Sequence, residues 1–260
     1  MKSLFRMKAP VLIPLLLLLI TSTFYSCDSK KEELEIAPAS DYFITLQKGK
    51  YITYRLDSTV FTQAGRQEEV HSYQEKHVVD EVITDGMGRP SYRIFRFLNN
   101  QNATGHWQPS GTYFITPLQR SVEVIEDNMR VVALVAPVRE GESWKGNRYL
   151  VSNPYGTNYT FNVDDNMADW DFVIEETNGE ETINGKKYTQ VITVSHADES
   201  LNVPITDTKS YASRIFSMAQ YSKNLGMIYQ EHILWEYQPN PNGTPYRTGF
   251  GVKRSVIDHN

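Results

Sequence analysis

Six histidines are the first candidates for catalytic or metal chemistry: His71, His77, His106, His196, His232 and His259. No two of them have the i, i+4 spacing that puts two zinc ligands on one helix face. His71 and His77 fall in one expected strand, where six residues span roughly 20 Å, too far to share a metal. The run Ser195-His196-Ala197-Asp198 contains the residue types of a catalytic triad, but neighbouring strand residues point to opposite faces. The sequence therefore predicts no catalytic histidine.

One acidic loop has the composition of a calcium site. Its candidate oxygen ligands are Asp164, Asp165, Asn166 and Asp169. Calcium binds several such oxygens from a flexible loop, but the EF-hand pattern requires glycine at the sixth position, where Asp169 stands. Asn and Asp are also common turn residues. We therefore expect an ordinary turn and predict no metal and no cofactor, with these four residues as the only calcium candidate.

Carboxylates and aromatic rings could together recognise a glycan. The paired acids Glu175, Glu176, Glu180 and Glu181 could supply the acid and nucleophile of a glycosidase. However, they flank an expected hairpin turn, where acidic side chains usually face solvent. Four tryptophans could stack on sugars, although aromatic residues also fill the cores of β proteins: Trp107, Trp144, Trp170 and Trp235.

The elements that would position these residues are predicted to be strands. Residues 50–61, 91–98, 111–116 and 128–136 are rich in β-branched and aromatic residues. In residues 91–98, the candidates for the inner face of the strand are Tyr92, Ile94 and Phe95. Arg93 and Arg96 are expected to reach water. Residues 210–221 fit neither a strand nor a helix clearly. This pattern predicts a mainly β protein built as an antiparallel sheet, a sandwich or a partly closed barrel.

Two hairpins are predicted from turn residues. The first hairpin joins expected strands over residues 171–177 and 186–194. Asn178-Gly179 and Asn184-Gly185 both suit its type I′ turn, and we favour Asn184-Gly185 because it directly precedes the second, stronger strand. Residues 226–237 and 250–257 form the second expected pair. Residues 239–245, rich in Pro, Asn and Gly, would be the loop between them.

The N-terminus has the pattern of an export signal. Lys2, Arg6 and Lys8 precede an apolar run, residues 11–20, which ends in small and polar residues. This run is about half the 17–25 residues that a transmembrane helix needs. We therefore assign residues 1–26 to a signal peptide.

Cys27 is the only cysteine of the chain, so it cannot form an intramolecular disulfide. A lone thiol after such a run, with Ser26 before it, resembles the lipid-modified cysteine of bacterial lipoproteins. Residues 28–40 are charged and contain proline, which is typical of a disordered spacer. We expect a lipid on Cys27, a flexible tether over residues 27–40 and one β-rich domain over residues 41–260. The alternative is an ordinary signal peptide cut nearby, which would leave a free thiol.

The charge balance argues against nucleic acid as a partner. Residues 1–26 hold three basic residues and no acid, so the rest has 23 Lys and Arg against 31 Asp and Glu. The formal charge is then −8, whereas nucleic-acid binding depends on Lys and Arg that neutralise phosphates.

Four segments resemble uncharacterised envelope lipoproteins of Bacteroidetes-type bacteria. They are the Tyr-Phe-Ile to Tyr-Ile-Thr-Tyr stretch at residues 42–54, Glu-Gly-Glu-Ser-Trp-Lys-Gly at residues 140–146, the Asn184-Gly185 hairpin, and residues 221–229. Lys31-Glu32-Glu33 also resembles the acidic signal that directs such lipoproteins to the cell surface. The resemblance implies a β-rich protein anchored by lipid to the outer membrane, on either face, and brings no catalytic residues with it.

Three functions remain open from the sequence. The first is a non-enzymatic envelope lipoprotein that binds a ligand or an envelope protein. The second is a hydrolase of glycans, and the third is a structural subunit of an outer-membrane complex. A concave apolar pocket would favour the first, paired carboxylates in a cleft the second, and a flat apolar patch the third.

Overall fold

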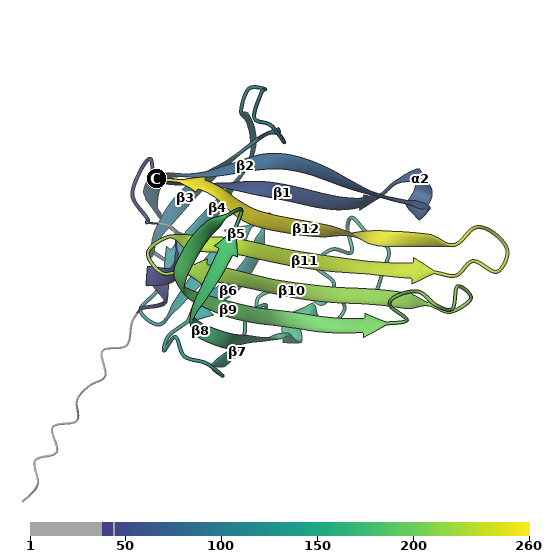
Figure 1. Ribbon diagram of the computed structural model, residues 1–260. Helices are drawn as coiled ribbons and strands as arrows, with labels where there is room; N and C mark the ends of the chain where they lie inside the picture. Colours follow the sequence, from purple (N-terminus) through teal and green to yellow (C-terminus); the bar gives the residue numbers. More distant parts are fainter. Residues whose placement is uncertain (1–37, 44) are drawn as a thin grey trace, which may run out of the picture. The chain divides into compact units, whose positions relative to one another are not determined.

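The computed structural model describes residues 38–43 and 45–260, which contain twelve strands and three short helical turns (Figure 1). The elements follow in the order η2 (Ala39–Tyr42), β1 (Tyr51–Phe61), α2 (Thr62–Gly65), β2 (Gln67–Thr84), β3 (Pro90–Asn100), β4 (Gln108–Pro117), β5 (Ser121–Glu126), β6 (Met129–Val135), β7 (Ser143–Lys145), η3 (Met167–Asp169), β8 (Asp171–Ile183), β9 (Lys186–Leu201), β10 (Ala212–Ser222), β11 (Gly226–Gln238) and β12 (Tyr246–His259). Cys27 and residues 1–37 lie outside the described residues.

All twelve strands belong to one antiparallel sheet, in which the first and last strands pair with each other. The order is β6-β5-β4-β3-β2-β1-β12-β11-β10-β9-β8-β7, so β6 and β7 are the two edges. These edges approach each other, because Val132 N donates to Gly146 O at 2.8 Å and Trp144 Nε1 donates to Val132 O at 2.7 Å. The sheet therefore curls into a nearly closed barrel, which confirms the predicted mainly β class in its partly closed form.

The predicted strands correspond to β1, β3, β4, β6, β8, β9, β11 and β12. Of residues 210–221, for which the sequence favours neither element, all from Ala212 onward lie in β10, which pairs with β9 and β11. The loop predicted over residues 239–245 joins β11 to β12, and these two strands pair as expected. No helix among residues 38–43 and 45–260 has the length and apolar character needed to cross a membrane.

The β8–β9 hairpin turns at Asn184-Gly185, as predicted. Both residues have positive φ, 50° and 78°, and the flanking Ile183 and Lys186 are paired. Asn178 also has a positive φ of 56°, but it lies where the β8–β9 register shifts and therefore forms part of a bulge. The turn also contacts β12, because Asn184 Nδ2 donates to Val256 O at 3.0 Å.

A Gly185→Val variant is expected to lose about 1–3 kcal/mol of unfolding free energy, because valine is strained at positive φ. For a domain of this size, each kcal/mol lowers the melting temperature by roughly 2–4 °C. Thermal denaturation measures the loss, with Gly179→Val as the control. A Cβ at Gly179 would meet Glu176 Oε1 at 2.9 Å, and that flexible side chain can move. A larger loss from Gly179→Val than from Gly185→Val would contradict this assignment.

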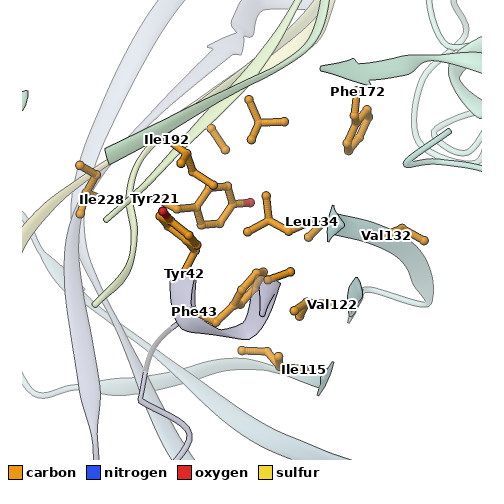
Figure 2. Close-up of a cluster of buried hydrophobic side chains, with 14 of the residues drawn as sticks. Tyr42, Phe43, Ile115, Val122, Val132, Leu134, Phe172, Ile192, Tyr221 and Ile228 are labelled. Carbon is orange, nitrogen blue, oxygen red and sulfur yellow. The ribbon is translucent and has the colours of Figure 1, made fainter. Parts of the chain in front are cut away.

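The segment before β1 packs into the barrel interior. Tyr42 and Phe43 are buried, and they contact side chains from both halves of the sheet (Figure 2). The phenyl ring of Phe43 lies 5.4 Å from the ring of Tyr221 on β10. This apolar cluster fills part of the interior with side chains that include Ile115, Val122, Leu134, Ile192 and Ile228.

One edge of the sheet is only partly covered. β7 pairs with Asp171–Val173 of β8, and Ile174 adds backbone hydrogen bonds to Gly141 and Glu142. Beyond Ile174, β8 has no neighbouring strand on that side within the described part of the chain. This free edge, residues 175–183, carries exposed glutamates and is interrupted by three shifts in register.

Candidate functional site

The barrel interior contains a cavity of about 350 Å³. Because alternate residues of a strand point to the same face, inward-facing pairs line it, such as Gln230 and His232 on β11 and Val252 and Arg254 on β12. Most of the remaining wall is apolar and includes Ile52, Ile115, Val124, Met129, Val131 and Met227. A volume of this size lies within the range of small-molecule pockets.

The long connection from β7 to β8, residues 146–170, covers part of the cavity. Leu150, Tyr155 and Met167 of this segment line the cavity. The segment is held internally, because Tyr155 N donates to Asp164 Oδ2 at 2.8 Å. It is also held to β11, where Asn162 N donates to Glu236 Oε1 at 2.6 Å. These bonds make it an ordered wall.

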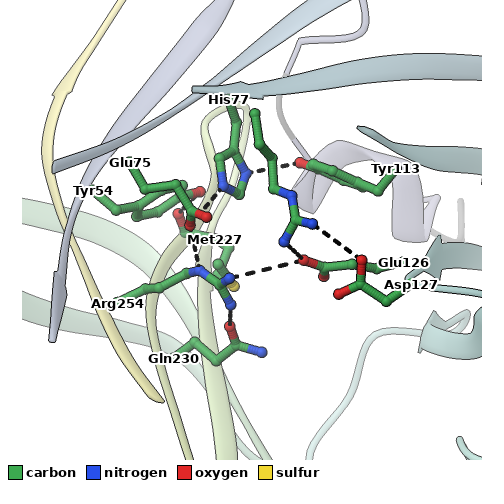
Figure 3. A network of polar contacts seen from close by, with 10 residues as sticks. Tyr54, Glu75, His77, Tyr113, Glu126, Asp127, Met227, Gln230 and Arg254 are labelled. Atoms are coloured by element: carbon green, nitrogen blue, oxygen red, sulfur yellow. Dashed lines mark hydrogen bonds and ion pairs between the residues drawn. The ribbon is translucent and has the colours of Figure 1, made fainter. Parts of the chain in front are cut away.

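A buried ion pair crosses the wall formed by β2, β1 and β12 (Figure 3). Arg254 Nε donates to Glu75 Oε2 at 2.7 Å, and Arg254 Nη1 donates to Gln230 Oε1 at 2.7 Å. His77 Nε2 lies 3.0 Å from Glu75 Oε2, and His77 Nδ1 lies 3.0 Å from the Tyr113 hydroxyl. Since a carboxylate only accepts, His77 donates to Glu75 from Nε2.

The protonation of this pair follows from its surroundings. Burial raises the pKa of Glu75, but Arg254 and His77 lower it by more, and the result lies well below its ordinary value. Burial lowers the pKa of Arg254, while Glu75 and Glu126 raise it by more. Both groups therefore keep their charges at neutral pH.

Arg96 is a second buried arginine, and the prediction that it reaches water was wrong. Its guanidinium contacts Glu126 and lies 3.2 Å from Asp127 Oδ1. Glu126 Oε1 also lies 3.8 Å from Arg254 Nη2, so it faces both arginines. Two features allow the burial: the β5–β6 turn supplies two carboxylates, and the neighbouring Gly111 leaves room. A Cβ at Gly111 would lie 2.4 Å from Arg96 Nη2.

Two other histidines share a serine at another part of the wall. His196 Nδ1 and His232 Nδ1 lie 2.8 Å and 2.9 Å from Ser217 Oγ, and His232 Nε2 lies 3.1 Å from the Tyr155 hydroxyl. Burial, with a smaller effect from His232, lowers the pKa of His196 to about 3. Burial, followed by Arg254, lowers the pKa of His232 to about 4. Both rings are therefore neutral at pH 7.

The number of donor hydrogens decides the direction of the hydrogen bonds that join Tyr155, His232, Ser217 and His196. Ser217 has one hydroxyl hydrogen, so it donates to one ring and accepts from the other. If Tyr155 donates to His232, then His232 donates to Ser217 and Ser217 donates to His196. This leaves only His196 Nε2 without a partner among the described residues. The reverse direction would also leave the Tyr155 hydroxyl hydrogen unpaired, so the first arrangement is favoured.

Aromatic rings surround these histidines. Phe172 stacks on His196 with ring centroids 3.9 Å apart, and the ring of Phe250 lies 4.9 Å from Tyr155 and 5.6 Å from His232. Trp170 also lines this part of the cavity. We call this group the aromatic wall; its members are Tyr155, Trp170, Phe172, His196, His232 and Phe250.

The calcium candidates are not gathered around a common point. Asp164 is buried, but Asp165, Asn166 and Asp169 are exposed. Burial raises the pKa of Asp164. Within residues 38–43 and 45–260, no group of three His, Cys, Asp or Glu side chains is placed to hold a metal ion.

The other sequence candidates lie away from the cavity or apart from each other. Asp198 pairs with Arg214, whereas His196 contacts Ser217 of the neighbouring strand, so Ser195-His196-Ala197-Asp198 forms no triad. Glu180 pairs with Lys187, and Glu181 accepts a hydrogen bond from Gln220. The glutamates of β8 do not line the cavity.

Comparison with known proteins finds no matching family model, no matching curated protein and no matching solved structure.

Proposed function

We propose that this protein is a non-enzymatic envelope lipoprotein, anchored by a lipid on Cys27, that binds a small apolar ligand inside its β-barrel. The observation that carries the binding proposal is the cavity of about 350 Å³, with its mostly apolar wall. A small number of polar groups, among them Gln230 and Glu126, lie in this wall, as in small-molecule sites. The anchor rests on the export-signal pattern, the lone cysteine and the charged residues after it.

The cavity suits binding better than the two alternative functions. Glu126 and Asp127 are the carboxylates that line it, and each contacts Arg96. Both are therefore engaged in ion pairs, whereas a glycosidase needs one carboxyl group free to protonate the glycosidic oxygen. The third alternative, a structural subunit, would use an external apolar patch and would have no need for a cavity.

Binding is tested with 1-aminonaphthalene, whose fluorescence increases in apolar surroundings. The wild-type protein is expected to take it up, because it is uncharged, aromatic and small enough for the cavity. Val252→Trp should weaken binding by at least about tenfold, or about 1.4 kcal/mol, since it fills space in the cavity. Val82→Trp is the matched control, because Val82 lies on β2 with 57% of its surface exposed.

Equal binding by wild type and Val252→Trp, with both proteins folded by circular dichroism, would show that the probe binds elsewhere. The absence of uptake by the wild type would contradict the proposed function.

The lipid anchor is tested by Cys27→Ala in the native host. We expect the variant to leave the membrane fraction or to accumulate as an unprocessed precursor, because no thiol is left to carry the lipid. Detergent phase partition and mass of the N-terminal peptide measure the two outcomes. A fully processed variant that still requires detergent for extraction would rule out Cys27 as the anchor.

A further inference from the structure

Each guanidinium group at the cavity faces at least one carboxylate of the protein itself. Arg254 faces Glu75 at 2.7 Å, Arg96 faces Asp127 at 3.2 Å, and Glu126 faces both arginines. Two guanidinium groups therefore face three carboxylates, which leaves no excess positive charge for an incoming anion. We infer that the cavity selects an uncharged ligand and that Glu126 and Asp127 set this selectivity. The inference rests on the proposed function, since it concerns the ligand of the same cavity.

The volume limits the size of the ligand. A water molecule takes about 30 Å³ in the liquid. At a similar volume for each non-hydrogen atom, a cavity of about 350 Å³ holds on the order of a dozen such atoms. A two-ring aromatic body with one short polar substituent has this size.

The aromatic wall favours a flat apolar body. Its phenyl, indole and phenol rings come from β8, β12 and the connection before β8, and its two imidazoles are neutral at pH 7. Aromatic rings pack against one another in stacked or edge-on arrangements with centroids about 4.5–7 Å apart. Two ring pairs of the wall have this spacing, Tyr155 with Phe250 at 4.9 Å and His232 with Phe250 at 5.6 Å.

Two polar atoms near the arginines are free to meet an uncharged head group. Gln230 uses its oxygen to accept from Arg254, which leaves its amide nitrogen as a donor. Glu126 contacts the arginines through Oε1, which leaves Oε2 as an acceptor. Both residues line the cavity, and the described residues supply no other partner for these two atoms. A hydroxyl or amide head can donate to Glu126 or accept from Gln230.

A charged head group on the ligand would make the binding free energy less favourable. A carboxylate would have to displace Glu126 or Asp127 from Arg96, and an ammonium would lie near two guanidinium groups. A carboxylate would find no excess positive charge, and an ammonium could reach Glu126 Oε2 only beside two guanidinium groups, so a charged head group is less favourable than an uncharged one. Selectivity of this kind comes from a repulsive element built into the site.

Glu126 and Asp127 are positioned by the β5–β6 turn, in which Asp127 and Asn128 have positive φ. Amides at both positions would leave two guanidinium groups facing one carboxylate, Glu75. The cavity would then carry an unbalanced positive charge, and its preference should change to an anionic ligand.

The experiment compares three probes with the same naphthalene body: 2-naphthylmethanol, 2-naphthoate and 2-naphthylmethylammonium. Isothermal titration calorimetry at pH 7 measures their dissociation constants for the full mature chain. The wild type is expected to bind the alcohol at least about tenfold more tightly than either ion. The variant Glu126→Gln/Asp127→Asn is expected to bind 2-naphthoate most tightly.

Two further variants keep the test interpretable. Asp127→Asn alone removes a charge from a side chain that is 65% exposed, so it should fold and shift the preference in the same direction by a smaller factor. Glu123→Gln is the matched control, because Glu123 is another β5 carboxylate that faces two arginines, but it does not line the cavity. It should leave the order of the three probes unchanged.

The outcomes separate the inference from the proposed function. Equal or tighter binding of either ion by the wild type would overturn the inference. So would binding of 1-aminonaphthalene without binding of 2-naphthylmethanol. An unchanged order in the folded double variant would overturn the role of Glu126 and Asp127. If neither 1-aminonaphthalene nor any of the three naphthyl probes binds, both the inference and the proposed function fail.

Discussion

An Arg254→Met variant is expected to lose about 3–5 kcal/mol of unfolding free energy, the cost of removing one partner from a buried ion pair. Glu75 would keep its place in the wall, 3% exposed, with only His77 beside it. Arg254 Nη1 would also no longer satisfy Gln230. Urea denaturation followed by tryptophan fluorescence measures the change.

Two further variants separate the lost pair from general damage. Arg55→Met removes an arginine whose side chain is 51% exposed and pairs with Asp57, so it should cost less than about 1 kcal/mol. Glu75→Gln combined with Arg254→Met should recover part of the loss, because it removes the unpaired charge. If the double variant is as unstable as the sum of the two single variants, Glu75 and Arg254 are not coupled.

Lowering the pH from 7 to 5 is expected to destabilise the domain strongly through His196 and His232. Both have folded-state pKa values, about 3 and about 4, below the ordinary value of 6.5. The unfolded chain therefore binds protons between these values that the folded chain does not. The stability from the neutral rings is present above pH 6.5 and is lost as the pH falls towards 4. At 1.36 kcal/mol per pKa unit, each ring loses at most about 2 kcal/mol of this stability by pH 5, because pH 5 lies about 1.5 units below 6.5.

The measurement is the slope of unfolding free energy against pH, from urea titrations between pH 5 and pH 7. His196→Gln and His232→Gln should each flatten the slope, whatever they do to stability at pH 7. His106→Gln should leave it unchanged, because His106 is exposed in the loop between β3 and β4 and pairs with no carboxylate among the described residues. A slope that is the same in all four proteins would show that neither buried histidine is linked to folding.

The local features of the fold could be predicted from the sequence because their causes are local. The Asn184-Gly185 turn needs two residues that tolerate positive φ, and only two dipeptides in that region supply them. The apolar run at β6 and the β-branched residues of β1 identify strands directly. β10 was left undecided because Met218, Ala219 and Gln220 have no strong strand preference. It becomes a strand through pairing with β9 and β11.

The cavity could not be predicted because its polar residues come from strands far apart in the sequence. Arg96 was expected in water because an arginine on a half-buried strand is normally solvated. Its partners Glu126 and Asp127 lie some thirty residues later, and nothing local connects them. The one local signal was Gly111, a glycine at the start of an expected strand, which marks a close approach. In the sequence His196 stands beside Ser195 and close to Asp198, which suggests a triad, whereas its hydrogen-bond partner is Ser217 on the next strand.

The free edge of β8 affects whether two molecules of this protein can associate by pairing their strands. A long uncovered strand offers unpaired backbone groups to any second chain, which is a common route to aggregation. Here the register shifts after Ile174, Glu176 and Gly179 interrupt the straight run that such pairing needs. Glu175, Glu176 and Glu180 would also repel the same edge of another copy. A nearly closed barrel can therefore keep one side open without forming continuous sheets between molecules, even when many copies are crowded together.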